Sequence, residues 1–118
     1  METYIVTIYA KEDHASDVQE YYQDLQNMYE EAPGFISRKI FRAKNGAMAK
    51  AVKATYSEEE LANIPEEDHD HGEHFVMIEE WKSIQDRINF GRSMSKEHHM
   101  KVIPYLLPNH SHDFYEAL

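Results

Sequence analysis

The fold is decided by residues 74–100, which read HFVMIEEWKSIQDRINFGRSMSKEHHM. Their first segment, His74–Trp81, is apolar and rich in β-branched and aromatic residues, so it predicts a strand. Ser83 follows with Asp86 three residues later, a spacing that predicts a capped helix start. We expect the inner face of that helix to carry the side chains at helical spacing, Ile84, Ile88, Gly91 and Met94.

The chain beyond this stretch predicts the last elements of the fold. Ser95 is a second candidate cap, and it predicts the start of a last helix. Pro104 lies inside the helical pattern, so a kink or an early end is expected there. Residues 110–117 then predict a closing strand.

The N-terminal half supplies matching elements. Residues 3–10 (TYIVTIYA) predict a strand, and apolar side chains from Ala15 to Ala32 then recur at the spacing of one buried helix face. Pro33-Gly34 ends this helix, and residues 35–43 alternate in the manner of a second strand. The order of elements therefore predicts an α+β fold of the ferredoxin-like β-α-β-β-α-β type, with its helices on one face of the sheet.

Length and composition limit the kind of protein. With 118 residues, 42% of them hydrophobic and 29% charged, the chain predicts one globular domain, residues 1–118. No apolar run reaches the length of a membrane span and no signal-peptide pattern opens the chain, so we expect no membrane partner and a cytoplasmic location. The absence of cysteine excludes disulfides, thiolate catalysis and Cys-ligated metal centres.

The net charge of −10 is concentrated in an acidic insert, residues 44–73, between the second and third predicted strands. Residues 57–73 hold eight acidic side chains and no Lys or Arg. The first part of the insert has helix-forming composition, and its polar second part is expected to be mobile. A nucleic-acid surface needs clustered Lys and Arg, which do not occur here, so we expect no nucleic-acid partner.

Four short stretches carry a resemblance to a known family. They are Tyr4-Ile5-Val6-Thr7, Ala32-Pro33-Gly34-Phe35, Phe75–Ser83 with the helix behind it, and Asp113-Phe114-Tyr115-Glu116. In these stretches and in their order, the chain resembles the antibiotic biosynthesis monooxygenase family, whose members adopt the dimeric α/β-barrel fold. The resemblance covers residues 3–43 and 74–117, and the insert has no counterpart in it.

The resemblance implies a homodimer in which two four-stranded sheets pack face to face. It also implies a pocket in each subunit, between the sheet and the helices. The third predicted strand independently favours a sheet that is covered on both faces, because it is apolar on both. Val76 and Ile78 point one way, and Phe75, Met77 and Trp81 point the other.

The resemblance further implies oxygenation of small aromatic or quinol-like compounds without a metal or flavin cofactor. In that chemistry a base removes an acidic proton from an electron-rich aromatic, and the anion gives an electron to oxygen. His99 is the candidate catalytic base, since it lies at helical spacing from Val102 and Ile103 and a neutral imidazole suits this role. The alternative interpretation of His99 is a hydrogen-bonded residue of the core.

Several residues of the expected pocket wall are predicted to bind the substrate. They are Thr7, Tyr9, Tyr22, Phe41, Trp81, Phe90 and His98. The alternative interpretation of the aromatic ones is core packing.

The heme-degrading branch of the same family uses a strand asparagine, a helix tryptophan and a histidine ligand. Thr7 and Phe90 stand at the first two positions, and His99 lies within a residue of the third. Two of three positions therefore depart, which disfavours that branch's oxygenation, although a helix histidine on an apolar face can still ligate heme iron.

The insert supplies a second candidate site. His69, His71 and His74 alternate with carboxylates, a combination that suits a divalent transition metal such as zinc, nickel or copper. Residues two apart point in opposite directions in an extended chain, so a turn is needed for them to converge. The alternative is a solvated acidic loop. His110 and His112, by contrast, share one face of the last predicted strand.

The leading hypothesis is therefore a cofactor-independent monooxygenase acting on a small aromatic ligand. The main alternative is a non-oxygenase binding protein of the same fold that takes heme or a transition metal through histidine. A third is an interaction module whose pocket is filled by side chains.

Overall fold

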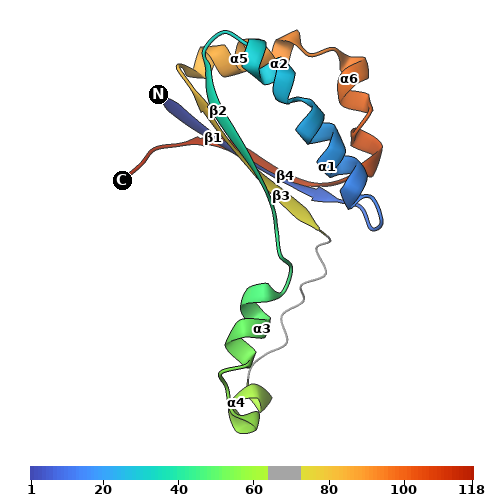
Figure 1. Cartoon of the computed structure of the whole chain (residues 1–118), viewed down its shortest axis with the longest axis vertical. Coiled ribbons are helices and arrows are strands. Elements are labelled where there is room, and N and C mark those ends of the chain that lie inside the picture. The colour runs from blue at the N-terminus through green and yellow to red at the C-terminus, as the bar shows by residue number, and fades with distance from the viewer. Residues whose placement is uncertain (64–72) are drawn as a thin grey trace.

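The computed structural model of the chain describes residues 1–63 and 73–118. A four-stranded antiparallel sheet forms its centre (Figure 1). The strands are β1 (Glu2–Ala10), β2 (Phe35–Arg42), β3 (His74–Trp81) and β4 (Leu106–Tyr115), in the spatial order β2-β3-β1-β4. This order and the helices between the strands are those of the ferredoxin-like fold, so the predicted α+β class is confirmed.

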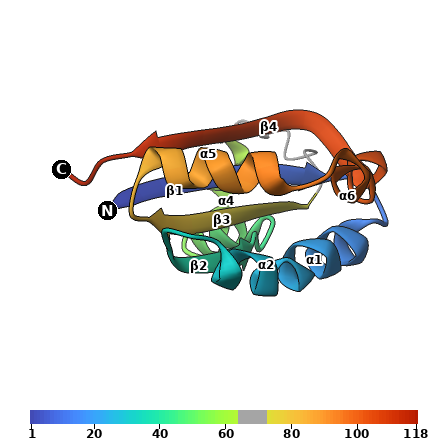
Figure 2. The ribbon, with the colours of Figure 1, turned by 90° about the horizontal axis from the view of Figure 1, so that it is seen from above.

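The helices that belong to the body cover one face of this sheet, as Figure 2 shows from above. They are α1 (Ala15–Asp24), α2 (Gln26–Glu31), α5 (Ile84–Ser93), α6 (Lys96–Met100) and a short 3-10 turn, η1 (Ile103–Tyr105). α1 and α2 run along the β2 side of the sheet, and α5 lies over β1. The helix predicted across residues 15–32 is therefore present, but it is interrupted at Leu25.

The last predicted helix ends early, for the reason expected. α6 stops at Met100, and Pro104 sits in the 3-10 turn that follows, because proline has no N–H to donate within a helix. β4 then begins at Leu106, four residues before the predicted strand. Among the described helices, none has the length and apolar character needed to cross a membrane.

Two helices of the insert stand apart from the body. α3 (Ala47–Lys53) and α4 (Glu58–Ala62) extend away from the sheet in Figure 1, and we call residues 44–63 the arm. They agree with the helix-forming composition of this part of the insert. The segment that was expected to be mobile, together with His69 and His71, lies outside the described residues.

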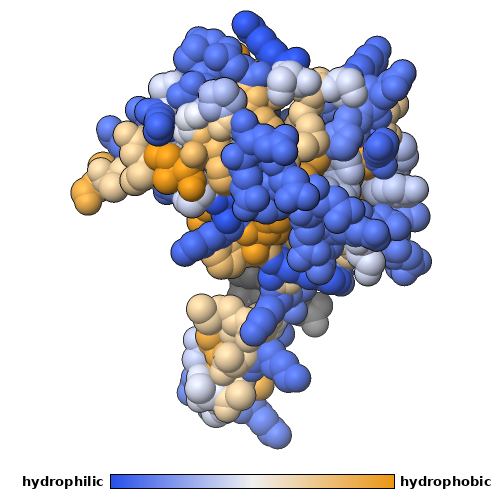
Figure 3. All heavy atoms as spheres, turned by 45° about the horizontal axis from the view of Figure 1, so that its top comes forward, coloured by the Kyte–Doolittle hydropathy of each residue, from blue (hydrophilic) through white to orange (hydrophobic). Residues whose placement is uncertain are grey.

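The core consists of two apolar clusters on the helix side of the sheet. The first lies under α1 and contains Ile8, Ala10, Ala15, Val18, Phe75, Met77 and Val102. The second lies at the other end, where α2 and α5 meet the sheet, and contains Leu25, Tyr29, Trp81 and Phe90. Polar residues cover most of the outer surface of the helices, as Figure 3 shows.

The face that α5 buries is rotated by part of a turn from the face predicted from the sequence. Ile84 and Ile88 remain 44% and 39% exposed, whereas Phe90 is 4% exposed. Ser83 caps the helix as predicted, accepting from the backbone N–H of Asp86. Turning Phe90 inward buries a large aromatic ring against Trp81, and this outweighs burial of the smaller isoleucines.

Candidate functional site

A cavity of about 700 Å³ lies between the sheet and the helices. That volume is in the range of pockets that hold small organic molecules. Much of its wall is apolar: Val6, Ile8, Leu25, Met77, Met94, Ile103, Leu106, Leu107 and Pro108. The predicted pocket between helices and sheet is therefore present, and it is not filled by side chains.

The alternation of the strands decides which side chains reach this cavity. Tyr4, Val6 and Ile8 of β1 line it, and on β3 so do Met77 and Glu79. Tyr4 and Glu79 are opposite each other in the β1–β3 register. The sheet thus contributes an apolar strip that ends in a phenol and a carboxylate.

The carboxylate of Glu79 is fully buried and accepts hydrogen bonds from three donors. Tyr29 Oη donates to Oε2 over 2.9 Å, and Trp81 Nε1 donates to Oε1 over 2.8 Å. Arg87 Nε also donates to Oε1 over 2.8 Å, which makes a buried ion pair. A buried carboxylate is tolerated only when it is paired in this way, so the three donors hold Glu79 inside the protein.

The phenol groups in the wall come from Tyr4, Tyr21, Tyr22 and Tyr29. Burial raises the pKa of Tyr22 to about 12. Burial, reinforced by the nearby Glu79 carboxylate, also raises the pKa of Tyr29, and Arg87 and Arg38 oppose this only in part. The pKa values of Tyr4 and Tyr21 are raised mainly by burial as well. All four phenols therefore stay protonated near neutral pH, so they can donate hydrogen bonds but cannot act as bases.

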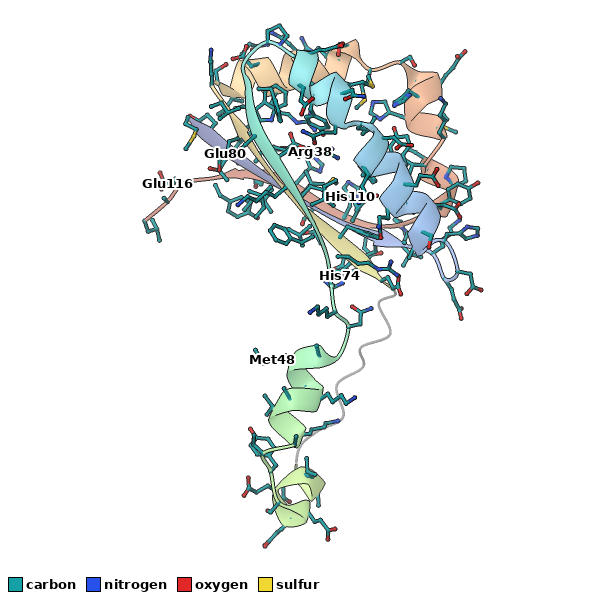
Figure 4. The ribbon with its side chains drawn as sticks, viewed as in Figure 1. Arg38, Met48, His74, Glu80, His110 and Glu116 are labelled. Atoms are coloured by element: carbon teal, nitrogen blue, oxygen red, sulfur yellow. The ribbon has the colours of Figure 1, made fainter. Side chains whose placement is uncertain are left out.

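Two guanidinium groups lie next to these rings. Arg38 of β2 stacks on the ring of Tyr29, 4.3 Å from its centroid, and donates to the carbonyl of Tyr22 over 2.7 Å. Arg87 of α5 lies 4.6 Å from the centroid of Tyr4. Burial lowers the pKa of Arg38, which still leaves it charged. Figure 4 shows Arg38 on the helix side of the sheet.

Three histidines line the cavity. His99 of α6 lines the cavity and is exposed to solvent. Within the described part of the chain, its ring makes no hydrogen bond. His110 and His112 of β4 stack with their centroids 5.4 Å apart and their planes at 4°, so the prediction that they share one face is confirmed. His98 packs beside Tyr21, with ring centroids 5.4 Å apart.

Of the predicted site residues, Tyr22 and His99 reach the cavity. Thr7, Tyr9 and Phe41 do not, contrary to the prediction. They alternate with Val6, Ile8 and Ile40, which face the helices, so their own side chains point to the other face of the sheet. Phe41 is 50% exposed there, and Tyr9 lies against the ring of His74.

Trp81 and Phe90 also differ from the prediction. Both are buried in the second apolar cluster, with their ring centroids 5.5 Å apart, and neither is part of the cavity wall. Their alternative interpretation as core packing fits this position. His98 is not part of the wall either, although it is a neighbour of Tyr21, which is.

The predicted metal residues are not brought together in the part that can be described. His74 lies at the start of β3, beside the arm in Figure 4, and His69 and His71 fall outside the described residues. In residues 1–63 and 73–118, no three side chains of the metal-ligating types converge on one point. His110 and His112 form a pair, and the part of the chain that the structure describes adds no third ligand to it.

Sequence reasoning missed Tyr4, Glu79 and Arg87. Glu79 did carry a signal, because it shares the inward face of β3 with Phe75, Met77 and Trp81, and a charged residue on a buried face needs a partner. Arg87 is three residues from Phe90 on α5, which is the spacing of one helix face. Only the structure shows that the face of α5 carrying Phe90, and therefore Arg87, points toward the sheet.

No known protein-family model matches the sequence, and no curated protein matches it. Solved structures do match the fold. A Nitrosomonas europaea protein proposed as an antibiotic biosynthesis monooxygenase has 15% identity and a TM-score of 0.67, covering 100% of this chain and 99% of that one. One from Bordetella bronchiseptica, with the same proposed identity, has 9% identity and a TM-score of 0.68, covering 99% and 96%.

SnoaB of Streptomyces nogalater, described as a cofactor-independent oxygenase, has 11% identity and a TM-score of 0.63 over 99% of this chain and 93% of its own. At such identities the likeness concerns the fold. This chain therefore has the ferredoxin-like α+β fold of solved proteins named as antibiotic biosynthesis monooxygenases.

Proposed function

We propose that this chain is a monooxygenase that oxidises a small aromatic or quinol-like compound with molecular oxygen, without a bound cofactor. The observation that carries the proposal is the cavity of about 700 Å³, with its apolar wall and its four protonated phenols. Such a wall suits a flat aromatic ring that bears hydroxyl groups. The fold shared with SnoaB, which is described as a cofactor-independent oxygenase, supports the same chemistry.

In the proposed reaction a base takes an acidic proton from the bound aromatic, and the resulting anion passes one electron to O2. The two radicals combine to form a C–O bond, and the peroxide that results loses water. One oxygen atom stays on the substrate as a carbonyl and the other leaves as water. A CH2 group and O2 thus give C=O and H2O, with all electrons and protons supplied by the two reactants.

His99 is the proposed base. The phenols of the wall are protonated, and the carboxylate oxygens of Glu79 already accept from three donors. An imidazole is the remaining group that accepts a proton near neutral pH. The rings of His110 and His112 stack on each other, and His110 Nδ1 lies 3.0 Å from the carbonyl of Pro108. Within the described residues, the ring of His99 has no such neighbour.

Replacing His99 with alanine is expected to lower kcat by about 10²-fold or more, because a positioned general base contributes at least this much. The measurement is the initial rate at which 18O-labelled product forms under 18O2, followed by mass spectrometry, for a panel of quinols and anthrones. His14→Gln is the matched control, since His14 lies outside the cavity and pairs with Asp17 on the surface.

An equal rate of oxygen incorporation in His99→Ala and in the native chain would remove His99 from the mechanism. An absence of 18O from every product of the panel would remove the monooxygenase proposal itself. Tight ligand binding without incorporation would favour the non-oxygenase binding protein.

We also propose that the chain forms a homodimer through the open face of its sheet. That face carries Ile5, Tyr9, Phe41, Val76 and Ile78, with Ile5 opposite Ile78 in the β1–β3 register. In Figure 1 no described helix lies against it. An apolar sheet face of this kind is stabilised when a second copy removes it from water.

Sedimentation equilibrium of the native chain is expected to give twice the 13.9 kDa chain mass. Ile78→Lys should shift this toward the monomer, because it places a charge at the centre of the open face. Ile84→Lys is the matched control, since Ile84 is exposed on α5, on the other side of the sheet. A native chain that stays monomeric at high micromolar concentration would contradict the dimer.

A further inference from the structure

The charges around the cavity do not balance. Arg38 and Arg87 both lie against its aromatic rings, and Glu79 is the one acidic side chain among the described residues of its wall. Arg87 forms an ion pair with that carboxylate, with a distance of 2.8 Å between Arg87 Nε and Glu79 Oε1. Among the described residues, Arg38 has no carboxylate as a hydrogen-bond partner, and it donates to neutral oxygens of Tyr22 and Gln26. Among the described residues, the cations at the cavity (Arg38, Arg87 and the exposed Lys11) therefore outnumber its one carboxylate, which favours an anion.

Arg87 is the group that can reach such an anion. Its side chain is 17% exposed, it belongs to the cavity wall, and it is held by its Nε–Glu79 bond and by the ring of Tyr4 below it. Neither terminal nitrogen, Nη1 or Nη2, donates to any residue in the described part of the chain. A guanidinium has five N–H donors, so Nε accounts for one of them and the four on the terminal nitrogens remain available.

Gly91 leaves room for one of these terminal nitrogens, Nη1. It is one helical turn beyond Arg87 on α5, and a Cβ atom at this position would lie 3.2 Å from Arg87 Nη1. An alanine there would require Nη1 to shift by a few tenths of an ångström. Glu79 thus fixes the arginine through Nε, the ring of Tyr4 lies against it, and Gly91 leaves space at Nη1.

We infer that Arg87 is a specificity-determining residue that binds a carboxylate of the ligand, so that the preferred ligand is an aromatic acid. Two terminal nitrogens match two carboxylate oxygens in a planar, bidentate pair. The apolar wall and the phenols then hold the ring. This inference rests on the proposed binding of an aromatic compound in the cavity, and it adds which functional group that compound carries.

A matched pair of ligands tests this by calorimetry at pH 7: 1-hydroxy-2-naphthoate and its uncharged amide, 1-hydroxy-2-naphthamide. The two share the ring and the phenol and differ only in the carboxylate. The native chain is expected to bind the acid at least about tenfold more tightly than the amide, as a charge-assisted pair predicts. Arg87→Gln should reduce this preference to near one, while Arg92→Gln, an exposed arginine on the same helix, should retain it.

Arg87→Lys serves as a second variant in case Arg87→Gln does not fold. Lysine keeps a positive charge beside Glu79 but lacks the two terminal nitrogens that form a bidentate pair. This variant is expected to fold, with a circular dichroism spectrum like that of the native chain, and to lose most of the preference. Equal binding of acid and amide by the native chain would overturn the inference and leave the aromatic cavity intact. Loss of the preference in Lys11→Gln but not in Arg87→Gln would overturn it too, since Lys11 is the other cation of the wall.

The outcomes separate the inference from the proposed function. A clear preference for the acid without any oxygen incorporation supports the role of Arg87 and removes the monooxygenase. Binding of neither ligand at millimolar concentration overturns the inference together with the aromatic cavity.

Discussion

Replacing Glu79 with alanine is expected to lower the free energy of unfolding by about 3–5 kcal/mol, the cost of leaving a buried charge without its partner. The change leaves the guanidinium of Arg87 without its ion-pair partner and removes the acceptor of both Tyr29 Oη and Trp81 Nε1. Urea denaturation followed by circular dichroism measures the effect. The expected loss is a large part of the stability of a domain of this size.

Glu80→Ala is the matched control for this change. Glu80 is the next residue on β3, but it faces the opposite side of the sheet, and among the described residues it accepts only from the hydroxyl of Thr3. We expect a loss of about 1 kcal/mol or less there. A double variant, Glu79→Leu with Arg87→Leu, should recover part of the loss, because it removes both charges together. Similar losses for Glu79→Ala and Glu80→Ala would contradict the role given to the buried pair.

Replacing Trp81 with alanine is expected to cost about 3–5 kcal/mol, the range for removing a large aromatic side chain from a core. Trp81 is fully buried, and its ring contacts those of Phe35 and Phe90, with centroids 5.5 Å away in each case. Its indole N–H also supports Glu79. Since Trp81 is the one tryptophan of the sequence, unfolding must be followed by circular dichroism and not by fluorescence.

Trp81→Phe separates the two contributions of this residue. It keeps a ring in the cluster but removes the donor to Glu79, so we expect an intermediate loss. Met48→Ala on the arm is the surface control, expected to change the free energy of unfolding by less than about 0.5 kcal/mol. If Trp81→Ala behaved like Met48→Ala, the second apolar cluster would not be the core that we describe.

The strands and helices could be predicted because their signals are local. Alternation along β1 and β3, the serine caps of α5 and α6, and the Pro33-Gly34 stop each depend on a few neighbouring residues. Gly34 shows how the local signal and the tertiary structure agree. Ala32, extended before Pro33, ends α2. Gly34 then turns the chain with a φ of +85°, and a Cβ there would lie 2.2 Å from Asp86 Oδ2 at the start of α5.

The site was harder to predict because both faces of the sheet are apolar. Strand alternation shows that Thr7 and Tyr9 share one face, but it does not tell which face the helices cover. Tyr22 could be assigned to the cavity because a helix has one apolar side toward the sheet, and Tyr22 lies on it. The strand residues had no such constraint, so Thr7, Tyr9 and Phe41 were assigned to the wrong face.

The sequence by itself determined the elements, their order and hence the ferredoxin-like fold, since hydrophobic periodicity and capping act within a few residues. Only the tertiary structure decided the chemistry of the cavity. Glu79 meets a phenol fifty residues away, at Tyr29, and a guanidinium eight residues away, at Arg87. These partners are set by which face the helices cover and by the rotation of α5. Both depend on how the apolar area of the whole domain is buried, and no local pattern contains that information.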